Sequence, residues 1–550
     1  MKQKLTVALG VVAVAAGIFA ATDDAAFRKA LPQDQKILHA LNRLTFGPRP
    51  GDVEAVQRMG LDKWIDEQLH PERLTENPEL AGYLAPLTTL QLTATEAAEK
   101  YQPRVAQVAQ ALKGPDRQLA QQQAKQQAKQ QAKQQAKQQG KQNGPQVLIR
   151  ELNEAKLYRA VYSERQLEEQ LADFWFNHFN VFAGKGADRV LVTSYERDAI
   201  RPHVLGKFRD ILGATAAHPA MLFYLDNWQN VSPDAAQQQG ALLDRLGRRN
   251  PERQAKLKAK QQGRGLNENY ARELLELHTL GVDNGYTQKD IIEVARCFTG
   301  WTILQPRQGG EFTYNDRMHD KGEKTVLGVK IPAGGGRGDG ERVLDILARR
   351  PETAHFLSLK LAQRFVSDDP PAALVDRMAK KFLDSDGDIR VVMAAMVGSS
   401  EFFAEGAWRA KVKTPLELVV SSARATSAQI RNAAPLAQQI AELGQPLYRK
   451  VEPTGYSSAA SEWVNSAALL ARMNFALALA SNQLPGTRVT SNGLNSDPVA
   501  MTRRFLFREP AAQTMATLEK ALAAQEREGK QRTPELVAGL VLGSPDFQRR

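Results

Sequence analysis

Apolar residues recur at the spacing of α-helices along most of this chain. Between residues 167 and 182, one helical face would carry Leu167, Leu171, Phe174, Trp175, His178 and Phe182. Similar stripes occupy 343–347, 356–365, 374–382, 391–397, 416–423 and 467–477. Residues typical of β-strands cluster only in EFTYN and KTVLGVKI, on either side of the turn DRMHDKGE. We therefore predict a mainly α fold, a large multi-helix domain with a small β-hairpin insertion at 311–331.

Cys297 is the only cysteine among 550 residues, so no intrachain disulfide can form. The same count excludes four-cysteine zinc sites, iron–sulfur clusters and a thiol redox pair. Because Cys297 lies within an apolar helical pattern, we expect a buried and unreactive thiol. The fold must then be stabilised by packing alone.

The first residues have the pattern of a secretory signal. Two lysines precede an apolar run from Leu5 to Phe19, and small residues follow at Ala20 and Ala21. We predict that residues 1–21 are a signal peptide and that the protein is exported, to the periplasm or beyond. An uncleaved N-terminal anchor is the alternative. A mean hydropathy of −0.42 argues against multi-span membrane insertion.

The net charge of +12 lies almost entirely outside the predicted folded body. Residues 121–142 carry five lysines and no acid, 231–265 carry eight basic and three acidic residues, and the signal adds Lys2 and Lys4. The domain, 28–550, is therefore interrupted by a Lys/Gln-rich insertion at 121–144 and a basic insertion at 231–265. Since the remainder is neutral, no nucleic-acid partner is expected.

The stretch LNENYARELLELHTLGVDNGYTQKD, residues 266–290, holds the first candidate site. On an α-helix, Asn269, Glu273 and Glu276 would line one narrow stripe. Two carboxylates one turn apart suit a divalent metal or a shared proton. The wet side of an amphipathic helix is the alternative explanation.

Other residues of this stretch have supporting roles. Arg272 would pair with Glu268 or orient an anionic group, and Asn267 would cap the helix start. Asn267 and Asn269 are therefore candidate binding residues. Thr287 and Asp290 form a capping box that opens the next helix.

Two further motifs place histidines among chemically useful neighbours. In FWFNHFNVF, 174–182, His178 is either a core residue or a ligand held rigid by aromatic packing, with Asn177 beside it. In MHDKGEKTVLG, 318–328, His319 and Asp320 would sit at the hairpin tip and face a cleft, unless this is a plain surface turn.

The candidate metal ligands are thus Glu273, Glu276, His178 and His319, with the metal itself unknown. No Gly-x-Ser-x-Gly, His-Glu-x-x-His or Walker motif occurs, so the common hydrolase and nucleotidase signatures are absent.

Six motifs, in order, carry a family resemblance. They are LNRLTFGPRPGDVEAV, FWFNHFNVF, FRDILGATAAHPAMLFYLDNWQN, LNENYARELLELHTLGVDNGYTQKDIIEVARCFTGW, HDKGEKTVLG and KTPLELVVSSARA. Together they resemble domain-of-unknown-function family 1800, large bacterial proteins of which many have export signals. The resemblance extends from about Leu38 to the C-terminal SPDFQRR. One departure is Tyr456-Ser457-Ser458, where the family pattern implies a Gly-Trp-Pro-like turn.

The resemblance implies a helical, exported protein that works with an exported partner of domain-of-unknown-function family 1501. It implies no reaction. We carry two hypotheses: an envelope or secreted binding and assembly component, and a metal-dependent or acid/base hydrolase-like enzyme. In the second, Glu273 and Glu276 would act with His319 and Asp320, and Arg272 would orient the substrate.

Overall fold

The computed structural model describes residues 25–101, 144–238, 265–306, 310–490, 493–529 and 531–550. The predicted signal peptide, nearly all of the 121–144 insertion and most of the 231–265 insertion lie outside the described residues. Within the described residues, no helix combines the length and apolarity needed to cross a membrane.

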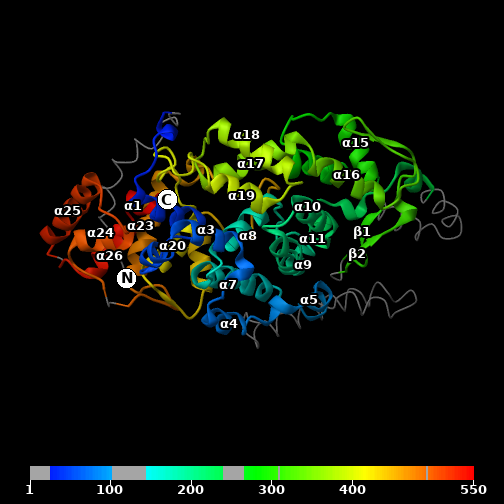
Figure 1. Ribbon diagram of the computed structural model, residues 1–550. Coiled ribbons are helices and arrows are strands. Elements are labelled where there is room, and N and C mark those ends of the chain that lie inside the picture. Colours follow the sequence, from blue (N-terminus) through cyan, green and yellow to red (C-terminus); the bar gives the residue numbers. More distant parts are fainter. Residues whose placement is uncertain (1–24, 102–143, 239–264, 307–309, 491–492, 530) are drawn as a thin grey trace, which may run out of the picture.

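The described chain is mainly α, as predicted, and forms an elongated body (Figure 1). The N-terminal third contains α1 (Gln33–Leu44), α2 (Asp52–Met59), α3 (Leu61–Leu69), α4 (Pro78–Leu84), α5 (Ala94–Tyr101), α7 (Gln146–Tyr162), α8 (Gln166–His178) and α9 (Asp188–Ser194). The middle contains α10 (Phe208–Ala217), α11 (Pro219–Tyr224), α14 (Asn269–Glu273), α15 (Gln288–Cys297), α16 (Gly338–Ala348), α17 (Pro351–Phe365), α18 (Ala372–Asp384) and α19 (Ile389–Val397).

The C-terminal third completes the body and supplies one of its ends. It contains α20 (Pro415–Ala425), α21 (Ala434–Glu442), α22 (Ala460–Trp463), α23 (Ser466–Ala480), α24 (Pro498–Leu506), α25 (Ala512–Arg527), α26 (Pro534–Leu542) and α27 (Pro545–Gln548). Helices α24 to α26 lie at one end of the molecule, with α8 near the middle (Figure 1). The strands β1 (Trp301–Ile303) and β2 (Phe312–Tyr314) lie at the other end.

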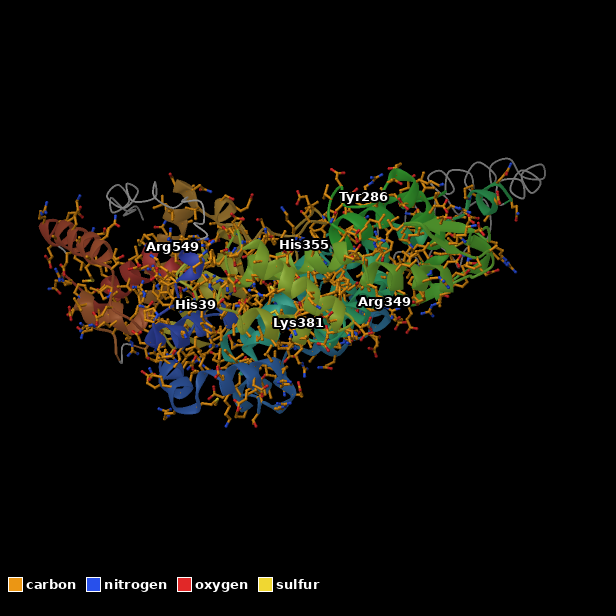
Figure 2. All side chains as sticks on the ribbon, turned by 45° about the horizontal axis from the view of Figure 1, so that its top comes forward. His39, Tyr286, Arg349, His355, Lys381 and Arg549 are labelled. Carbon is orange, nitrogen blue, oxygen red and sulfur yellow. The ribbon has the colours of Figure 1, made fainter. Side chains whose placement is uncertain are left out.

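The N-terminal helix and the C-terminal residues meet in space. Figure 2 shows His39, in α1, on the same side of the molecule as Arg549, while Tyr286 lies toward the opposite end. The Arg550 side chain donates a hydrogen bond of 3.3 Å to the Arg43 carbonyl, which joins the C-terminal segment to α1. The domain is therefore closed by contacts between residues about 500 positions apart in sequence.

The small β insertion is confirmed, but the predicted pairing of its strands is wrong. β2 (Phe312–Tyr314) pairs with β1 (Trp301–Ile303), and β3 (Lys324–Val326) pairs with β4 (Val329–Ile331). A third antiparallel pair joins β5 (Gln429–Ile430) to β6 (Thr487–Arg488). The segment 324–331 closes on itself because Leu327 and Gly328 both adopt positive φ, which makes a tight turn between β3 and β4.

Seven helices coincide with the apolar stripes: α8, α16, α17, α18, α19, α20 and α23. Helix α8 lies at the centre, with Leu167, Leu171 and Trp175 completely buried. It ends at His178, so Phe182 lies beyond the helix and not in its stripe. Cys297 is also buried, as predicted, and burial raises the pKa of its thiol.

Candidate functional site

A cleft of about 310 Å³ opens beside the C-terminal end of α8. Its walls come from α7, α8, α17 and the loop 445–459, with Asp368 and Thr414 at the margin. The lining is mostly polar and includes Lys156, Asp173, Asn177, His178, Asn180, Lys360, Gln363, Arg364, Gln445, Tyr448, Thr454, Tyr456, Ser457 and Ser458. A ligand of small-molecule size fits such a volume.

His178 holds the ammonium group of Lys360 at the wall of this cleft. The His178 ring hydrogen-bonds the His278 carbonyl through Nε2, at 3.1 Å, and the Lys360 ammonium through Nδ1, at 3.0 Å. A carbonyl only accepts, so Nε2 carries the proton and Nδ1 accepts from Lys360. Burial, and then the nearby charge of Lys360, holds the pKa of His178 well below its usual range. His178 is therefore a neutral acceptor that positions Lys360.

Lys360 differs from the other basic groups of the cleft in lacking a carboxylate partner. Lys156 Nζ lies 2.9 Å from Asp173 Oδ1, and Arg364 Nη2 lies 3.0 Å from Glu417 Oε1. In the part of the chain that the structure describes, Lys360 Nζ contacts His178 and the Phe356 ring but no carboxylate. Burial lowers the pKa of Lys360 to about 8. An anion entering the cleft would supply the missing countercharge.

The two asparagines of FWFNHFNVF fix the loop that forms the opposite wall. Asn177 donates from Nδ2 to the Tyr456 carbonyl and accepts from the Tyr456 N–H at Oδ1, both at 2.6 Å. Asn180 Nδ2 donates to the carbonyls of Lys450 and Glu452, at 3.1 and 2.9 Å. The motif thus places His178 in one wall of the cleft, while Asn177 and Asn180 hold the loop that faces it.

The loop 445–459 approaches the backbone of Asn177 so closely that a glycine is required at the contact. Gly455 has φ +70°, and a Cβ there would lie 2.2 Å from the Asn177 carbonyl oxygen. Only glycine fits both the conformation and the space. Gly455 is followed in the sequence by Tyr456-Ser457-Ser458, the residues at which this chain departs from the family pattern. All three residues line the cleft. This chain therefore exposes hydroxyl groups where a Gly-Trp-Pro-like turn was expected.

Further polar groups of the lining have no partner among the described residues. The Gln363 side chain, one helical turn beyond Lys360 on α17, and the Ser458 hydroxyl make no described side-chain hydrogen bond. Because residues three apart on a helix share a face, Gln363 and Lys360 present an amide and an ammonium to the same ligand. In the described part of the chain, the cleft thus offers an ammonium group without a carboxylate partner, flanked by neutral hydrogen-bonding groups.

The predicted carboxylate helix is not an uninterrupted α-helix. After α14 the chain forms a π-helix, Leu274–Thr279, in which Leu280 N–H donates to the Leu275 carbonyl. The Thr279 hydroxyl also donates to the Leu274 carbonyl, at 2.7 Å, within the same π-helix. This π-helix also directs the His278 carbonyl at His178. The 100° periodicity assumed for the stripe therefore fails after Glu273.

Glu273 and Glu276 are half-buried and lie outside the lining of the cleft. Burial and then the neighbouring charge of Glu276 raise the pKa of Glu273. Arg272 pairs with Glu276 at 3.4 Å and with Glu268 at 3.5 Å. The two predicted carboxylates are thus close together, with Arg272 beside them.

His319 and Asp320 lie in a separate polar network. His319 Nε2 lies 3.1 Å from Asp339 Oδ2, and Lys324 Nζ donates to the same oxygen at 2.6 Å, with all three residues buried. Asp320 accepts two hydrogen bonds from Arg296, at 2.9 and 3.0 Å. These contacts join the turn to α15 and α16. They also engage the side chains of His319 and Asp320, to which the enzyme hypothesis assigned catalytic roles.

The two halves of the proposed catalytic set attach to different ends of α15. Arg272 donates to Gln288 at its first residue, whereas Asp320 binds Arg296 near its last. Eight residues of α-helix separate these anchors by about 12 Å. The structure shows no direct contact between the halves, and the catalytic roles of all five residues stay predictions.

Asn267 and Asn269 bind backbone groups of the neighbouring segment. Their Nδ2 atoms donate to the carbonyls of Asp226 and Leu225, at 3.0 and 3.3 Å. Asn267 Oδ1 also accepts the Asn269 N–H, but the N-cap of α14 is Glu268, one residue after the predicted cap, and it makes no side-chain capping bond. Both side chains hold α14 in place.

The candidate metal ligands are not gathered. Among the described residues, no group of three or more histidine, cysteine, aspartate or glutamate side chains is arranged to hold a metal ion. His178 is bonded to Lys360 and His319 to Asp339, so each ring already has a protein partner.

Lys360 was missed by sequence reasoning, although a signal was present. It lies four residues after Phe356, in the apolar stripe 356–365, where a lysine is unusual. A basic residue in a core-facing stripe is held by a partner or faces a cavity. Lys360 is bonded to His178 and also lines the cleft.

Comparisons with known proteins give one match. The family model described as protein of unknown function (DUF1800) matches residues 39–549. No curated protein and no solved structure matches.

Proposed function

Since the chain belongs to the DUF1800 family of proteins of unknown function, we propose its function from the cleft: it binds a ligand that presents an anionic group to Lys360. The observation that carries this proposal is the Lys360 ammonium, bonded to neutral His178 and lacking a carboxylate partner among the described residues. A carboxylate, sulfate or phosphate group on the ligand would pair with it.

The rest of the lining supports a polar ligand. Gln363, Ser458 and Thr454 supply an amide and hydroxyls close to the cation, and Phe174 and Tyr456 supply aromatic surface. The carboxylates of Asp173 and Asp368 are already paired, with Lys156 and Lys411 respectively. Among the described residues of the lining, three side chains are basic and two acidic, and Lys360 is the basic one without a carboxylate partner.

We place this binding activity outside the cytoplasm, on the basis of the signal-like residues 1–21. In that setting the protein would serve as an envelope or secreted binding and assembly component. A partner of family 1501 remains the proposal that the family resemblance implies. The anionic group recognised at Lys360 would belong to the ligand that the two proteins handle.

Amine reactivity tests the proposal directly. We expect acetic anhydride to acylate Lys360 with a half-maximal rate near pH 8, because its pKa is lowered to about 8, when labelling is followed by peptide mass spectrometry. Sulfate in the cleft would keep the amine charged and shielded, and should slow its acylation about tenfold at pH 8. Chloride at equal ionic strength is the reference.

Lys380 is the internal control in the same digest. It lies on α18, its side chain is 75% exposed, and its partner is Asp384. Sulfate should leave its acylation rate unchanged. If sulfate slows both lysines equally, or neither, anion binding at Lys360 is refuted.

A further inference from the structure

A second cavity, of about 370 Å³, lies among the C-terminal helices, away from the cleft. Helices α23 and α26 pack closely because α26 contributes glycines at the contact: a Cβ at Gly539 would lie 2.7 Å from Leu477 Cδ2, and one at Gly543 would lie 2.5 Å from Met473 Sδ. Helix α25 covers this pair but leaves a hollow beneath it. The hollow is lined by Met473 of α23, Leu540 of α26, and Thr517, Leu518 and Ala521 of α25.

One part of the cavity wall is apolar. Met473, Leu518 and Leu540 are 9%, 4% and 2% exposed, and Ala521 lies beside them in the lining. A hydrocarbon chain lying against these side chains would gain van der Waals contacts and leave water. The wall therefore favours an apolar group of several carbons.

Another part of the lining is charged. Arg409, Asp546 and Arg549 all belong to it. Asp546 accepts hydrogen bonds from Arg409 and, at 2.9 Å, from Arg508, which lies outside the lining. Arg549 has no carboxylate partner in the described chain. Among the described residues of the lining, two guanidinium groups therefore accompany one carboxylate that is already paired.

We propose that this cavity is a second binding site, specific for a single-chain amphipathic anion, with the chain against Met473 and Leu540 and the head group at Arg549. Guanidinium groups bind carboxylates and phosphates in bidentate geometry, and an excess of them beside an apolar wall matches a molecule with one charged end. The site is independent of Lys360 and of the ligand of the cleft.

Calorimetric titration of the full chain with dodecanoate, below its micelle concentration, tests this site. We expect one molecule bound per chain. Affinity should rise about fourfold for each methylene added from octanoate until the cavity is full. Dodecyltrimethylammonium, with the same chain and the opposite charge, should bind at least tenfold more weakly.

Two pairs of variants locate the ligand. Arg549→Gln should weaken dodecanoate binding at least tenfold, whereas Arg503→Gln, an exposed arginine of α24, should not. Ala521→Leu fills the cavity and should also weaken binding at least tenfold. Ala524→Leu, on the exposed face of the same helix, should leave it unchanged. A melting temperature within a few degrees of wild type confirms that each variant is folded.

The proposal is overturned if wild-type protein fails to bind dodecanoate at millimolar concentration, or if Arg549→Gln and Ala521→Leu both bind normally. Vesicles of phosphatidylglycerol separate a free amphiphile from a bilayer lipid. Binding to vesicles without binding to dodecanoate would also overturn the site, because it would place the contact on the protein surface. Neither result would bear on Lys360.

Discussion

Replacing Glu417 by glutamine is expected to remove at least about 3 kcal/mol from the free energy of unfolding. Glu417 is 2% exposed, and its Oε1 lies 3.0 Å from Arg364 Nη2 and 2.7 Å from Arg550 Nη2. Burial alone would raise its pKa, but the charges of Arg364 and Arg550 dominate and lower it to about 2. The carboxylate is therefore ionised at neutral pH.

Glutamine isolates the charge because it keeps the size and one hydrogen bond of the native side chain. Glu417 Oε2 accepts the Thr414 N–H at 2.8 Å in a capping box that opens α20, and the amide oxygen of glutamine can do the same. The substitution removes only the negative charge that faces two buried guanidinium groups, those of Arg364 and Arg550. Since native proteins are stable by only about 5–15 kcal/mol, the variant should be severely destabilised.

Urea denaturation followed by circular dichroism measures this effect. Asp384→Asn is the matched control, because Asp384 pairs with Lys380 at the surface, where both side chains are more than half exposed. That variant should change stability by less than about 1 kcal/mol. A loss below about 1 kcal/mol for Glu417→Gln would show that the arginines find other partners.

Mild acid is expected to destabilise the protein steeply between pH 7 and pH 5. Burial lowers the pKa of His218 to about 4 and that of His278 to about 3, and it holds those of His39 and His178 well below the usual range. In the unfolded chain a histidine titrates near 6.5. The unfolded state therefore binds more protons, and stability present above pH 6.5 is lost as the pH falls.

The expected loss of stability follows from the difference between the histidine pKa values in the folded and unfolded states. At pH 5, each histidine that stays neutral in the folded state costs about 2 kcal/mol of stability relative to pH 8. His218 and His278 together account for about 4 kcal/mol, and His39 and His178 act in the same direction. The free energy of unfolding, measured in urea from pH 8 to pH 5, should show a slope that corresponds to about four protons taken up on unfolding.

One variant pair checks the origin of this slope. His39→Phe should reduce the proton uptake by about one, since both ring nitrogens of His39 are buried among Phe402, Phe403 and Trp408. His278→Phe should reduce it by a similar amount, because burial lowers the pKa of His278 to about 3. A flat stability profile between pH 8 and pH 5 would mean that these histidines are accessible to protons in the folded protein.

Local sequence patterns predict the helices of this fold well. The seven apolar stripes all form helices because a core-facing stripe needs only neighbours at i+3 and i+4. The Thr287–Asp290 capping box forms as expected because both partners lie within three residues, whereas the N-cap of α14 is Glu268, one residue after the predicted Asn267. In each case the determining interaction is contained in the segment itself.

Interactions between distant segments explain what the sequence does not predict. The strand at 312–314 pairs with the preceding segment 301–303, and a two-residue turn lets 324–331 pair with itself. The alternation of apolar and polar residues does not determine which segment a strand pairs with. The π-helix at 274–279 changes the angular position of every later side chain in the candidate stripe. Thr414 and Glu417 form a capping box within one turn, whereas the contacts of Glu417 with Arg364 and Arg550 join segments far apart in the sequence.

The candidate site shows the same limit. The FWFNHFNVF motif predicts that His178 is either a core residue or a ligand held rigid by packing, but its contacts in the structure include Lys360, 182 residues later, and Asn177 holds a loop 279 residues later. Glu273 and His319 are both candidates in the sequence, and the fold places them in separate networks. Only the three-dimensional arrangement singles out the unpaired ammonium.

The most direct test of the cleft is a crystal structure of the protein with selenate, located by the anomalous scattering of selenium. We predict a peak in the cleft with a selenate oxygen about 3 Å from Lys360 Nζ, and no peak there in Lys360→Gln crystals grown in the same way. Selenate bound only at surface sites, with none beside Lys360, would contradict the assignment of this cleft as an anion-binding site.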